Sequence, residues 1–513
     1  MPLKNQYEVI IVGYGPLGQL CALLLSKLGI RTAIIERYKD VNPLPRASVV
    51  DDQSLRLMNV IEIYDEIKNL FNTPEFLDYT LPDGKILQRS IVKETLDGYP
   101  NVSTFYQPDL ENALRKMVSK SDLIDLYLQH DLISLRETDS SVSVKCKSIE
   151  KNKLNEIEGS FLIACDGVNS SIRKKLKIPS EDLKYNKDWL IVDINTNEKS
   201  LLGNTIRQVC DYERPTSFTY LSDKRCRWEF QLLPGEDKDE MMQDHKIASL
   251  IEKYIDSSSY SIDRRDIYKF RAECSKYWLK GRVALLGGAA YQLPPFGYQS
   301  LNSEIRDINN FCWKLDLVLK NKCNIDILLS YKAEREPVAK ETISSSLAMG
   351  QLIDSIAVSS KKNIPLEESV PPEARSQAFK DMRMYSENTD STKIIFYESE
   401  ITKSFNSSIP NFYITFKNER VLFDKLLGLN FCIFTSGEYI FSKKINHFLQ
   451  EIEAKIYDTN IIDIEDAFMK ESFKNHSFII RPDRKIFGVS DNEVSLEQMC
   501  NDLMTKIFYI EKS

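Results

Sequence analysis

The sequence predicts an α/β protein with more than one domain, and three observations lead to that prediction. Between residues 7 and 36, two β-branched apolar runs enclose a glycine-rich turn and an apolar stretch with helical spacing, the order of a parallel-sheet unit. From residue 189 to 274, apolar and polar residues alternate as in antiparallel strands. The length of 513 residues exceeds the roughly 300 that one hydrophobic core usually serves.

The first strand, Tyr7 to Val12, runs directly into Gly13, Gly15 and Gly18, which have the spacing G-x-G-x-x-G. Glycines at this spacing allow a tight turn, a close approach of the backbone to a pyrophosphate, and close packing of the following helix on the sheet. The second strand ends at Glu36, where a carboxylate can accept both hydroxyls of an adenosine ribose. The stretch predicts a Rossmann-like dinucleotide site for FAD or NAD rather than NADP, and a plain strand–turn–helix is the alternative.

Two polar residues farther along are candidates for the same site. Arg46 lies in the proline-punctuated loop 42–47, where it either borders the nucleotide or is a solvated loop residue. Asp166 follows the apolar run 161–165, so it ends a buried strand. Open α/β sheets bind ligands at the carboxyl ends of their strands. Asp166 is therefore a candidate ligand group, and a purely turn-forming role is the alternative.

The middle of the chain predicts an antiparallel sheet, which we interpret as the platform for a substrate. Residues 76–102 are expected to add strands to it from an insertion in the nucleotide domain. One helix, roughly Met241–Ile255, is expected between the later strands. Those period-two strands are Leu190–Asn195, Thr205–Cys210, Ser217–Leu221, Arg227–Leu232 and Ile267–Ala272.

A third glycine-containing segment, residues 281–291, leads through a proline-rich loop at 294–297 into a predicted helix, Ser303–Leu319, with more helix to about Ser355. Residues 361–378 are rich in Pro, Glu, Ser and Lys and predict a linker. Beyond the linker a compact α/β unit is expected. Its predicted strands are Phe412–Phe416, Phe431–Phe434 and Phe478–Arg481, and its predicted helices are His447–Tyr457 and Leu496–Ile510.

Composition narrows the class of protein. The net charge of −7 and the isoelectric point near 5.5 argue against a nucleic-acid-binding surface, which needs clustered Lys and Arg. Ten cysteines without a C-x-x-C pair are typical of a reducing compartment, and four scattered histidines give no zinc-type spacing. No apolar run reaches the ~18 residues of a membrane span, and residues 1–6 do not resemble a signal peptide. We expect a cytoplasmic protein with no membrane partner.

Together these motifs resemble the FAD-dependent aromatic hydroxylases, which are single-component flavoprotein monooxygenases. The likeness covers the whole length and is greatest to the branch acting on 3-(3-hydroxyphenyl)propionate and related phenols. Besides the glycine motif, the motifs that carry it are Pro45-Arg46-Ala47, Gln107-Pro108-Asp109-Leu110, Asp166-Gly167, Arg227 to Glu236, Arg282 to Gly287, Pro294 to Gly297, Asn302, Arg306-Asp307 and Ile480 to Asp483.

The resemblance implies that FAD lies with its adenosine on Glu36, that NADH or NADPH reduces it, and that molecular oxygen and a small aromatic substrate are the reactants. It also implies cofactor-binding roles outside the glycine motif. The residues concerned are Arg37, Arg46, Gln107, Asp166, Gly288, Pro295, Gly297 and Asn302. The sequence identifies no catalytic side chain and no metal ligand.

The resemblance further implies an organisation into domains. Residues 1–75, 103–185 and 276–360 are expected to form the FAD domain, and 76–102 with 186–275 the inserted antiparallel-sheet substrate domain. Residues 361–390 are expected to be a linker and helix, and 391–513 a thioredoxin-like carboxyl-terminal domain. That last part has no C-x-x-C, so its expected role is packing or contact within a homodimer and not thiol chemistry.

The sequence departs from the family near the flavin. The family's Gly-Asp is Gly287-Gly288 here, and Tyr291 stands where a histidine is common. Two glycines of the loop beside the flavin ring are replaced by Tyr298 and Ser300. Three hypotheses follow: an FAD monooxygenase that hydroxylates an aromatic compound, a family member with weak or absent flavin binding that has another reaction or a binding role, and a flavin enzyme of another oxidative type.

Overall fold

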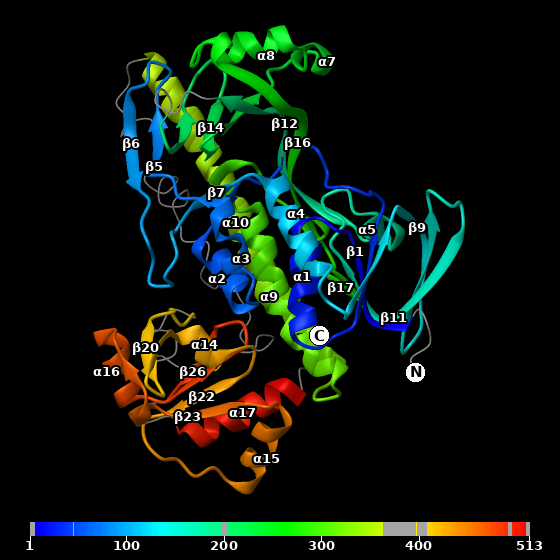
Figure 1. Ribbon diagram of the computed structural model, residues 1–513, viewed down its shortest axis with the longest axis vertical. Coiled ribbons are helices and arrows are strands. Elements are labelled where there is room, and N and C mark those ends of the chain that lie inside the picture. The colour runs from blue at the N-terminus through cyan, green and yellow to red at the C-terminus, as the bar shows by residue number, and fades with distance from the viewer. Residues whose placement is uncertain are drawn as a thin grey trace.

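The computed structural model describes residues 6–44, 46–196, 203–362, 397, 408–490 and 495–508. Figure 1 shows two parts: a large amino-terminal part that contains two extended sheets, and a smaller carboxyl-terminal domain beneath it in orange and red. Most of the predicted linker, residues 363–390, lies outside the described residues.

A parallel sheet organises the amino-terminal part, as the glycine motif predicted. Its strands run in the order β17-β18-β11-β1-β2-β8, and β1 (Gln6–Val12) lies between β2 (Thr32–Glu36) and β11 (Leu154–Ala164), parallel to both. Val9 is in register with Thr32 on one side and with Phe161 on the other. The apolar residues of β1 are almost fully buried because α1 (Pro16–Lys27) covers the sheet and is itself packed against α4 (Gln107–Val118) and α9 (Ser300–Leu319).

Other short elements complete this part. β9 and β10 continue the sheet from β11, and β3, β7 and β4 form a small sheet of their own. The remaining elements are β3 (Val49–Val50), α2 (Asp52–Val60), α3 (Tyr64–Ile67), β4 (Phe71–Asn72), β7 (Ser103–Phe105), β8 (Ile124–Leu128), β9 (His130–Glu137), β10 (Val142–Ser148), α5 (Ser171–Lys175), β17 (Leu279–Lys280), β18 (Val283–Leu285) and the 3₁₀ turns Lys68–Leu70, Gly287–Ala289 and Phe296–Tyr298.

The second sheet has eight strands in the order β19-β16-β12-β15-β14-β13-β5-β6. Its neighbours are antiparallel except β5 and β13, which run parallel with Phe76 opposite Thr205. The strands are β5 (Phe76–Thr80), β6 (Ile86–Ile91), β12 (Ser180–Thr196), β13 (Thr205–Val209), β14 (Thr216–Ser222), β15 (Arg225–Gln231), β16 (Tyr260–Ser275) and β19 (Tyr291–Gln292).

The prediction of one helix over residues 241–255 is wrong. Two short helices, α7 (Lys238–Met241) and α8 (Asp244–Ile251), stand there, and a 3₁₀ turn, Ser257–Ser259, follows them. Gln243 separates the two helices because its backbone is extended, with φ −75° and ψ 144°. The Asp237 side chain begins α7 by accepting the N–H of Glu240, an N-cap signal that hydrophobic spacing alone does not contain.

Two long helices connect the sheets to the rest of the protein. Helix α9 begins at Ser300, three residues earlier than the predicted Ser303, so its first turn belongs to the loop after the third glycine segment. Helix α10 (Leu329–Lys362) follows the 3₁₀ turn Ile325–Leu328 and continues through Pro337. In Figure 1, α9 and α10 run through the middle of the molecule, and α10 reaches up to the second sheet.

The carboxyl-terminal domain is built on the sheet β23-β22-β25-β26, in which β22 and β23 are parallel and the other pairs antiparallel. A second sheet, β21-β20-β24, lies beside it. The elements are β20 (Tyr413–Phe416), β21 (Glu419–Leu422), α14 (Phe423–Leu427), β22 (Cys432–Thr435), α15 (Lys443–Glu451), β23 (Lys455–Asp458), the 3₁₀ turn Thr459–Ile461, β24 (Asp463–Ile464), α16 (Ala467–Asn475), β25 (Phe478–Ile480), β26 (Ile486–Val489) and α17 (Leu496–Phe508).

The predicted helix His447–Tyr457 is wrong in its second half. Helix α15 ends at Glu451, and Lys455–Asp458 is the strand β23. The chain turns at Glu453, which has a φ of 54°, and the next residues pair with β22, Ile456 opposite Ile433. Pairing with a distant strand decided the structure here against the local helical pattern.

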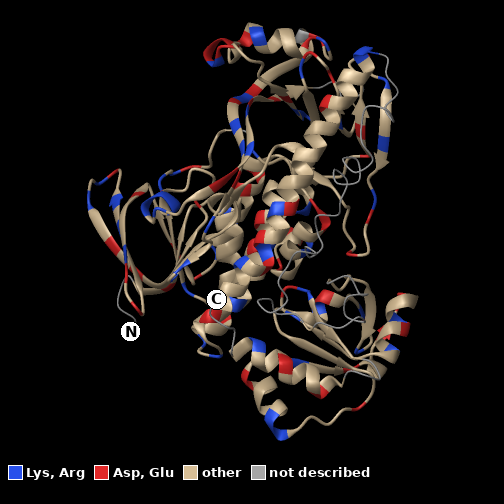
Figure 2. Ribbon diagram, turned by 180° about the vertical axis from the view of Figure 1, so that it is seen from behind, with Lys and Arg blue, Asp and Glu red and all other residues tan. Residues whose placement is uncertain are grey.

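Charged residues of both signs occur throughout the described fold. In Figure 2, basic and acidic residues are interspersed along the ribbons of both parts. Within the described ranges, no helix combines the length and the hydropathy that crossing a membrane requires.

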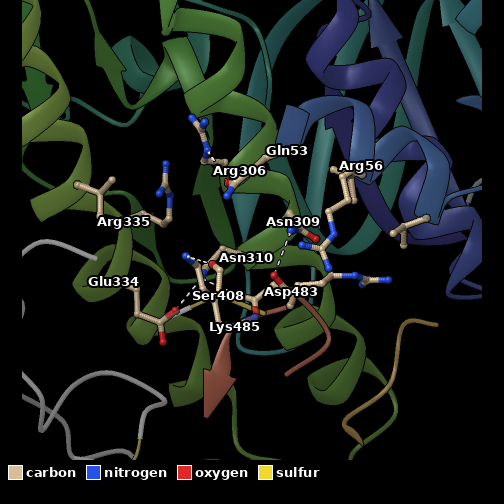
Figure 3. Close-up of a pocket in the computed structure, with 14 residues that line it drawn as sticks. Gln53, Arg56, Arg306, Asn309, Asn310, Glu334, Arg335, Ser408, Asp483 and Lys485 are labelled. Atoms are coloured by element: carbon tan, nitrogen blue, oxygen red, sulfur yellow. Dashed lines mark hydrogen bonds between the residues drawn. The ribbon is translucent and has the colours of Figure 1, made fainter. Parts of the chain in front are cut away.

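The carboxyl-terminal domain docks on the larger part through buried charges. Glu334 on α10 accepts hydrogen bonds from Arg481 at 2.8 Å and from Lys314 at 3.0 Å, and all three side chains are fully buried. A cavity of about 60 Å³ remains at this interface. Figure 3 shows Arg306, Arg335 and Lys485 pointing into it from different elements.

Candidate functional site

The glycine motif forms an open turn between β1 and α1. A Cβ on Gly18 would overlap the carbonyl oxygen of Gly13, and a Cβ on Gly13 would overlap that of Cys165, so these two glycines allow close packing. Gly15 is different, because no described atom lies within 4 Å of where its Cβ would be. None of the described side chains caps the first turn of α1, and the space beside Gly15 is open. We call this space, bounded by residues 13–18, Glu36 and residues 287–288, the cradle.

Glu36 stands at the carboxyl end of β2, at one end of the cradle. Its Oε2 accepts the backbone N–H of Tyr14 at 2.8 Å, and its Oε1 accepts that of Tyr38 at 2.9 Å. A carboxylate offers about four acceptor positions, so each oxygen keeps one for a ligand. The two backbone bonds fix the carboxylate beside the glycine turn.

Helix α4 brings a second carboxylate to the same end, which the sequence did not reveal. Gln107 donates from Nε2 to Glu111 at 2.6 Å, and its own Oε1 is buried without a described hydrogen-bond partner. Burial raises the pKa of Glu111 and so does the nearby Glu36, while Gln107, Arg115 and Arg46 act to lower it. The structure therefore brings Glu36, Gln107 and Arg46 together, as expected, around the unpredicted Glu111.

Asp166 forms the turn into helix α5, and one of its oxygens is left without a described partner. Its Oδ2 accepts the backbone N–H groups of Ser171 at 2.7 Å and Ile172 at 3.2 Å, which begins helix α5. Its Oδ1 is buried and has no hydrogen-bond partner among the described residues. The adjacent Gly167 has a φ of 72° and open space where a Cβ would lie. One carboxylate oxygen thus fixes the turn, and the other remains available to a ligand.

The third glycine segment lies against helix α9, and Glu304 makes the contact. The N–H of Gly288 donates to Oε1 of Glu304 at 3.0 Å, and the N–H of Gly287 donates to Asp307 at 3.2 Å. Burial, and next the neighbouring Asp307, raise the pKa of Glu304 to about 8 against the opposing effects of the Gly288 bond and Arg46. Sequence reasoning missed Glu304, since it lies at the beginning of a predicted helix and belongs to no motif.

Asn302 is fully engaged with the protein. Its Oδ1 accepts hydrogen bonds from the N–H of Asp51 at 3.0 Å and from the hydroxyl of Ser54 at 2.8 Å. Its Nδ2 donates to the carbonyl oxygen of Tyr298 at 2.9 Å. These bonds join α2 to the loop before α9, so the structure gives Asn302 a positioning role.

Tyr298 crosses from this loop to the antiparallel sheet. Its backbone has a φ of 55°, the left-handed region that favours glycine, and it follows Gly297 at φ 80°. Its hydroxyl lies 2.8 Å from that of Ser217 on β14. Burial and the nearby Glu229 raise the pKa of the Tyr298 phenol to about 12, so it is protonated at neutral pH. The ring is therefore held on the sheet side of the loop.

Buried charges lie on the sheet beside Tyr298. Asp193 on β12 accepts a hydrogen bond from Nε of Arg227 at 2.7 Å and also forms an ion pair with Arg264 on β16. Burial alone would raise the pKa of Asp193, but the two arginines outweigh it and the pKa lies below its usual value. Arg227 also donates to the carbonyl oxygen of Arg46, which joins the sheet to the loop above the cradle. Burial raises the pKa of the neighbouring Glu229, and the positive charge of Arg227 offsets part of that rise.

The remaining predicted residues lie apart from the centre of the cradle. Arg37 is exposed and pairs with Asp131 at 3.5 Å on the surface. Pro295 precedes the turn Phe296–Tyr298, in which Phe296 packs edge-on against Trp189 with ring centroids 5.8 Å apart. These residues shape the loop, and they place an aromatic cluster between the second sheet and α10.

The residues of the cradle fit a dinucleotide such as FAD. The open position at Gly15 and the uncapped first turn of α1 suit a pyrophosphate, which helix N-termini favour. The spare acceptor positions of Glu36 suit a ribose, and Asp166 offers a buried oxygen without a described partner. Among the described residues no group of side chains suits a metal ion.

Comparisons with known proteins agree with this fit. Residues 6–346 match the family model described as "FAD binding domain". A 3-(3-hydroxy-phenyl)propionate/3-hydroxycinnamic acid hydroxylase of Comamonas testosteroni is 26% identical over 351 residues, which are 68% of this chain and 59% of the relative. This alignment, like one with a Burkholderia vietnamiensis hydroxylase of the same activity, spans less than two thirds of the relative's length. A probable NADH-specific resorcinol 4-hydroxylase of Rhodococcus jostii is 23% identical over 98% of this chain and 96% of its own.

Solved structures share the fold over the full length. The flavin-dependent monooxygenase PieE, in complex with FAD and substrate, superposes with a TM-score of 0.80 at 16% identity and covers 98% of this chain and 99% of its own. Aklavinone-11 hydroxylase, in a ternary complex with FAD and aklavinone, gives a TM-score of 0.77 at 18% identity with the same coverage.

Proposed function

The chain belongs to the FAD binding domain family, and on that premise we propose that it is an FAD-dependent monooxygenase that hydroxylates a phenol or another small aromatic compound with NADH or NADPH as reductant. The names of the relatives, which include hydroxylases of hydroxyphenylpropionate and resorcinol, support an aromatic substrate. The single observation that carries the proposal is the contact of Tyr298 with Ser217, because it joins the loop that follows the third glycine segment to the antiparallel sheet.

FAD would be held at its phosphates by the first turn of α1 and at its ribose by Glu36. When bound and reduced, FAD supplies the activation of oxygen that side chains cannot provide. The residues of this chain would bind and orient FAD and the substrate, and they would exclude water from the site. Arg227 joins the antiparallel sheet to the loop at Arg46. Tyr298 remains protonated at neutral pH, so its hydroxyl can donate a hydrogen bond.

The aromatic cluster next to Tyr298 supports an aromatic ligand. Trp189 and Phe296 pack edge-on, and Tyr185, which accepts a hydrogen bond from Trp189, also packs edge-on against Phe296 with centroids 6.0 Å apart. Aromatic pockets with a few polar groups recognise rings by such contacts. Ser217 and the Tyr298 hydroxyl are the polar groups that would face a phenol.

The carboxyl-terminal domain is proposed to have a structural role. The order β23-β22-β25-β26, with one parallel pair, supports a thioredoxin-like arrangement. Its cysteines Cys432 and Cys500 are buried and unpaired, and burial raises the pKa of both thiols to about 12, which disfavours thiol chemistry. The structural role that we propose for this domain includes contact between two copies of the chain in a homodimer.

A second candidate function has a specific observation in its favour. Glu304 lies in the cradle, and Tyr298 replaces a glycine of the related flavin loops, which together favour a family member that holds FAD weakly and has another role. The colour of the purified protein separates the two candidates, because bound oxidised FAD is yellow.

The proposed activity is tested by following nicotinamide oxidation with and without a panel of simple phenols. A hydroxylase should oxidise NADH or NADPH faster when its aromatic substrate is present, and the product should gain one oxygen atom by mass. Oxidation that no aromatic compound accelerates, in a protein that holds FAD, would point to another flavin reaction. A protein that neither holds FAD nor oxidises nicotinamide would contradict the proposal.

A further inference from the structure

Glu304 has an environment that its structural role alone does not explain. Its carboxyl group is half-buried, and among the described residues its hydrogen bond is the single one from Gly288, at 3.0 Å, with no ion pair. A carboxylate that is removed from water without a cationic partner is costly, and such groups tend to bind a proton instead. Helix α9 nevertheless directs this side chain at the third glycine segment and not at solvent.

The position of Glu304 relative to the cradle is defined by the glycines around it. A Cβ on Gly287 would lie 2.6 Å from Cδ2 of Leu17 and 2.7 Å from Cγ of Glu304, so these two side chains flank the same point. Leu17 belongs to the first turn of α1, where the phosphates of a dinucleotide would bind. A Cβ on Gly288 would lie 3.3 Å from both Oε1 of Glu304 and Cα of Gly167. Glu304 therefore lies beside both the first turn of α1, where phosphates would bind, and the third glycine segment.

The charges around Glu304 come from five elements. Asp307 lies on the same helix and is itself paired with Arg335 at 2.7 Å. The groups that face Glu304 from other elements are Arg46 in the loop before β3, Tyr268 on β16, Tyr291 on β19 and Cys165 after β11. Arg46 is the one cation of this set, and its side chain is exposed. The balance favours the neutral acid.

We propose that Glu304 is a residue of the cofactor site that must carry a proton when FAD binds, so that FAD binding is coupled to proton uptake. The inference rests on the proposed function insofar as it takes FAD as the ligand. The physical reason is that the pyrophosphate is anionic, and a second anion in a poorly hydrated site would repel it. The neutral acid removes the repulsion and keeps its bond to Gly288.

The direction of the pH effect follows from this coupling. Burial places the pKa of Glu304 at about 8 in the free protein, and a bound anion would raise it further. FAD then binds preferentially to the protonated form, so its affinity is constant below that pKa and falls as the pH rises through it. With a pKa near 8, affinity at pH 9 should be about tenfold weaker than at pH 7.

The experiment is a titration of flavin-free full-length protein with FAD, followed by flavin fluorescence at pH 7, 8 and 9 at constant ionic strength. The wild type should lose about tenfold in affinity from pH 7 to 9, whereas Glu304→Gln should show no change over this range. Glu336→Gln is the matched control: it makes the same change on α10, where Glu336 pairs with Lys332 at 3.0 Å, and it should keep the wild-type slope.

Calorimetry of the wild type alone provides a second measurement, should Glu304→Gln fail to fold. FAD binding at pH 8.5, compared in buffers of different ionisation enthalpy, should take up about 0.75 of a proton. Tight FAD binding with no pH dependence and no proton uptake would overturn the role of Glu304 and leave the cofactor assignment intact. A pH slope that persists in Glu304→Gln would assign the proton to another group. Absence of FAD binding in both proteins at every pH would overturn the cofactor assignment itself.

Discussion

Arg56 on helix α2 donates two hydrogen bonds to the carboxylate of Asp424 in the carboxyl-terminal domain, at 2.6 and 2.7 Å. Both side chains are buried, and Arg56 also pairs with Asp97 at 3.0 Å. Burial alone would raise the pKa of Asp424, but Arg56 and Arg484 outweigh it and the pKa lies below its usual value. The two parts of the molecule are therefore joined by buried ion pairs, and a charged side chain that lost its partner there would not be solvated by water.

Arg56→Met should lower the free energy of unfolding by about 3–5 kcal/mol, because it leaves buried Asp97 without its described cation and Asp424 with Arg484 alone. Urea unfolding followed by circular dichroism measures this. Arg420→Met is the matched control, since Arg420 and Glu465 form a surface pair that solvent screens, and its loss should change stability little. Equal, small effects of the two variants would show that the buried pair is not what joins the two parts.

Gly15→Val should abolish FAD binding while the protein keeps its thermal stability. A branched side chain at position 15 would occupy the space where a pyrophosphate must approach, yet its Cβ would have no described atom within 4 Å in the free protein. FAD titration and a melting curve of the same sample measure the two effects. Gly18→Val should instead unfold the protein, because its side chain would overlap the backbone of Gly13. A folded Gly15→Val protein with unchanged flavin affinity would contradict the assignment of this turn.

Gly288→Asp should not strengthen FAD binding by itself, although the family resemblance alone predicts that it would. The new carboxylate would lie against Glu304, whose Oε1 is 3.3 Å from the point that a Cβ on Gly288 would occupy. In a Glu304→Gly background the same substitution should strengthen binding by about 10- to 100-fold, the effect of one hydrogen bond to a charged group. FAD titration of the two single variants and the double variant tests this. Equal gains with and without Glu304 would show that the two carboxyl groups do not meet.

Tyr298→Phe and Ser217→Ala should each lower the free energy of unfolding by about 1 kcal/mol, and the double variant should lose little more than either, since both remove the same hydrogen bond. The same variants should change the dependence of nicotinamide oxidation on an aromatic substrate. Tyr413→Phe, at a partly exposed tyrosine of the other domain, is the control and should change neither property. Strictly additive losses in the double variant would mean that the two hydroxyl groups do not interact.

The parts of the fold that local patterns encode could be predicted from the sequence. Gly13, Gly15 and Glu36 lie where the motif placed them, because strand, turn and helix are all set within about thirty residues. The second half of the helix predicted at 447–457 failed because pairing of Ile456 with Ile433 across the sheet is not visible in a local window. Glu304 was missed for a related reason, since its helix was predicted but the glycine segment it faces was not placed in space.

The site shows the same division. The sequence identified Tyr298 as an unusual residue, and the structure adds that its ring is turned to Ser217 rather than left beside the cradle. Glu111 could have been found, because it lies one helical turn after Gln107 on the same face of α4. The catalytic side chain that the sequence did not identify is not singled out by the geometry either, which is consistent with a cofactor that carries the chemistry.

The interleaving of the two sheets has a consequence for how the chain folds. The parallel sheet needs β1, β11 and β18, which span residues 6 to 285, while the second sheet needs β5 from the first hundred residues beside β13. Neither sheet can be completed during synthesis until strands far along the chain have left the ribosome. Contacts this distant in sequence form slowly and expose unpaired strand edges meanwhile. Synthesis of the first 292 residues is therefore the stage at which this protein is most exposed to aggregation. A fragment ending at residue 185 would lack β17 and β18 of the first sheet and most strands of the second.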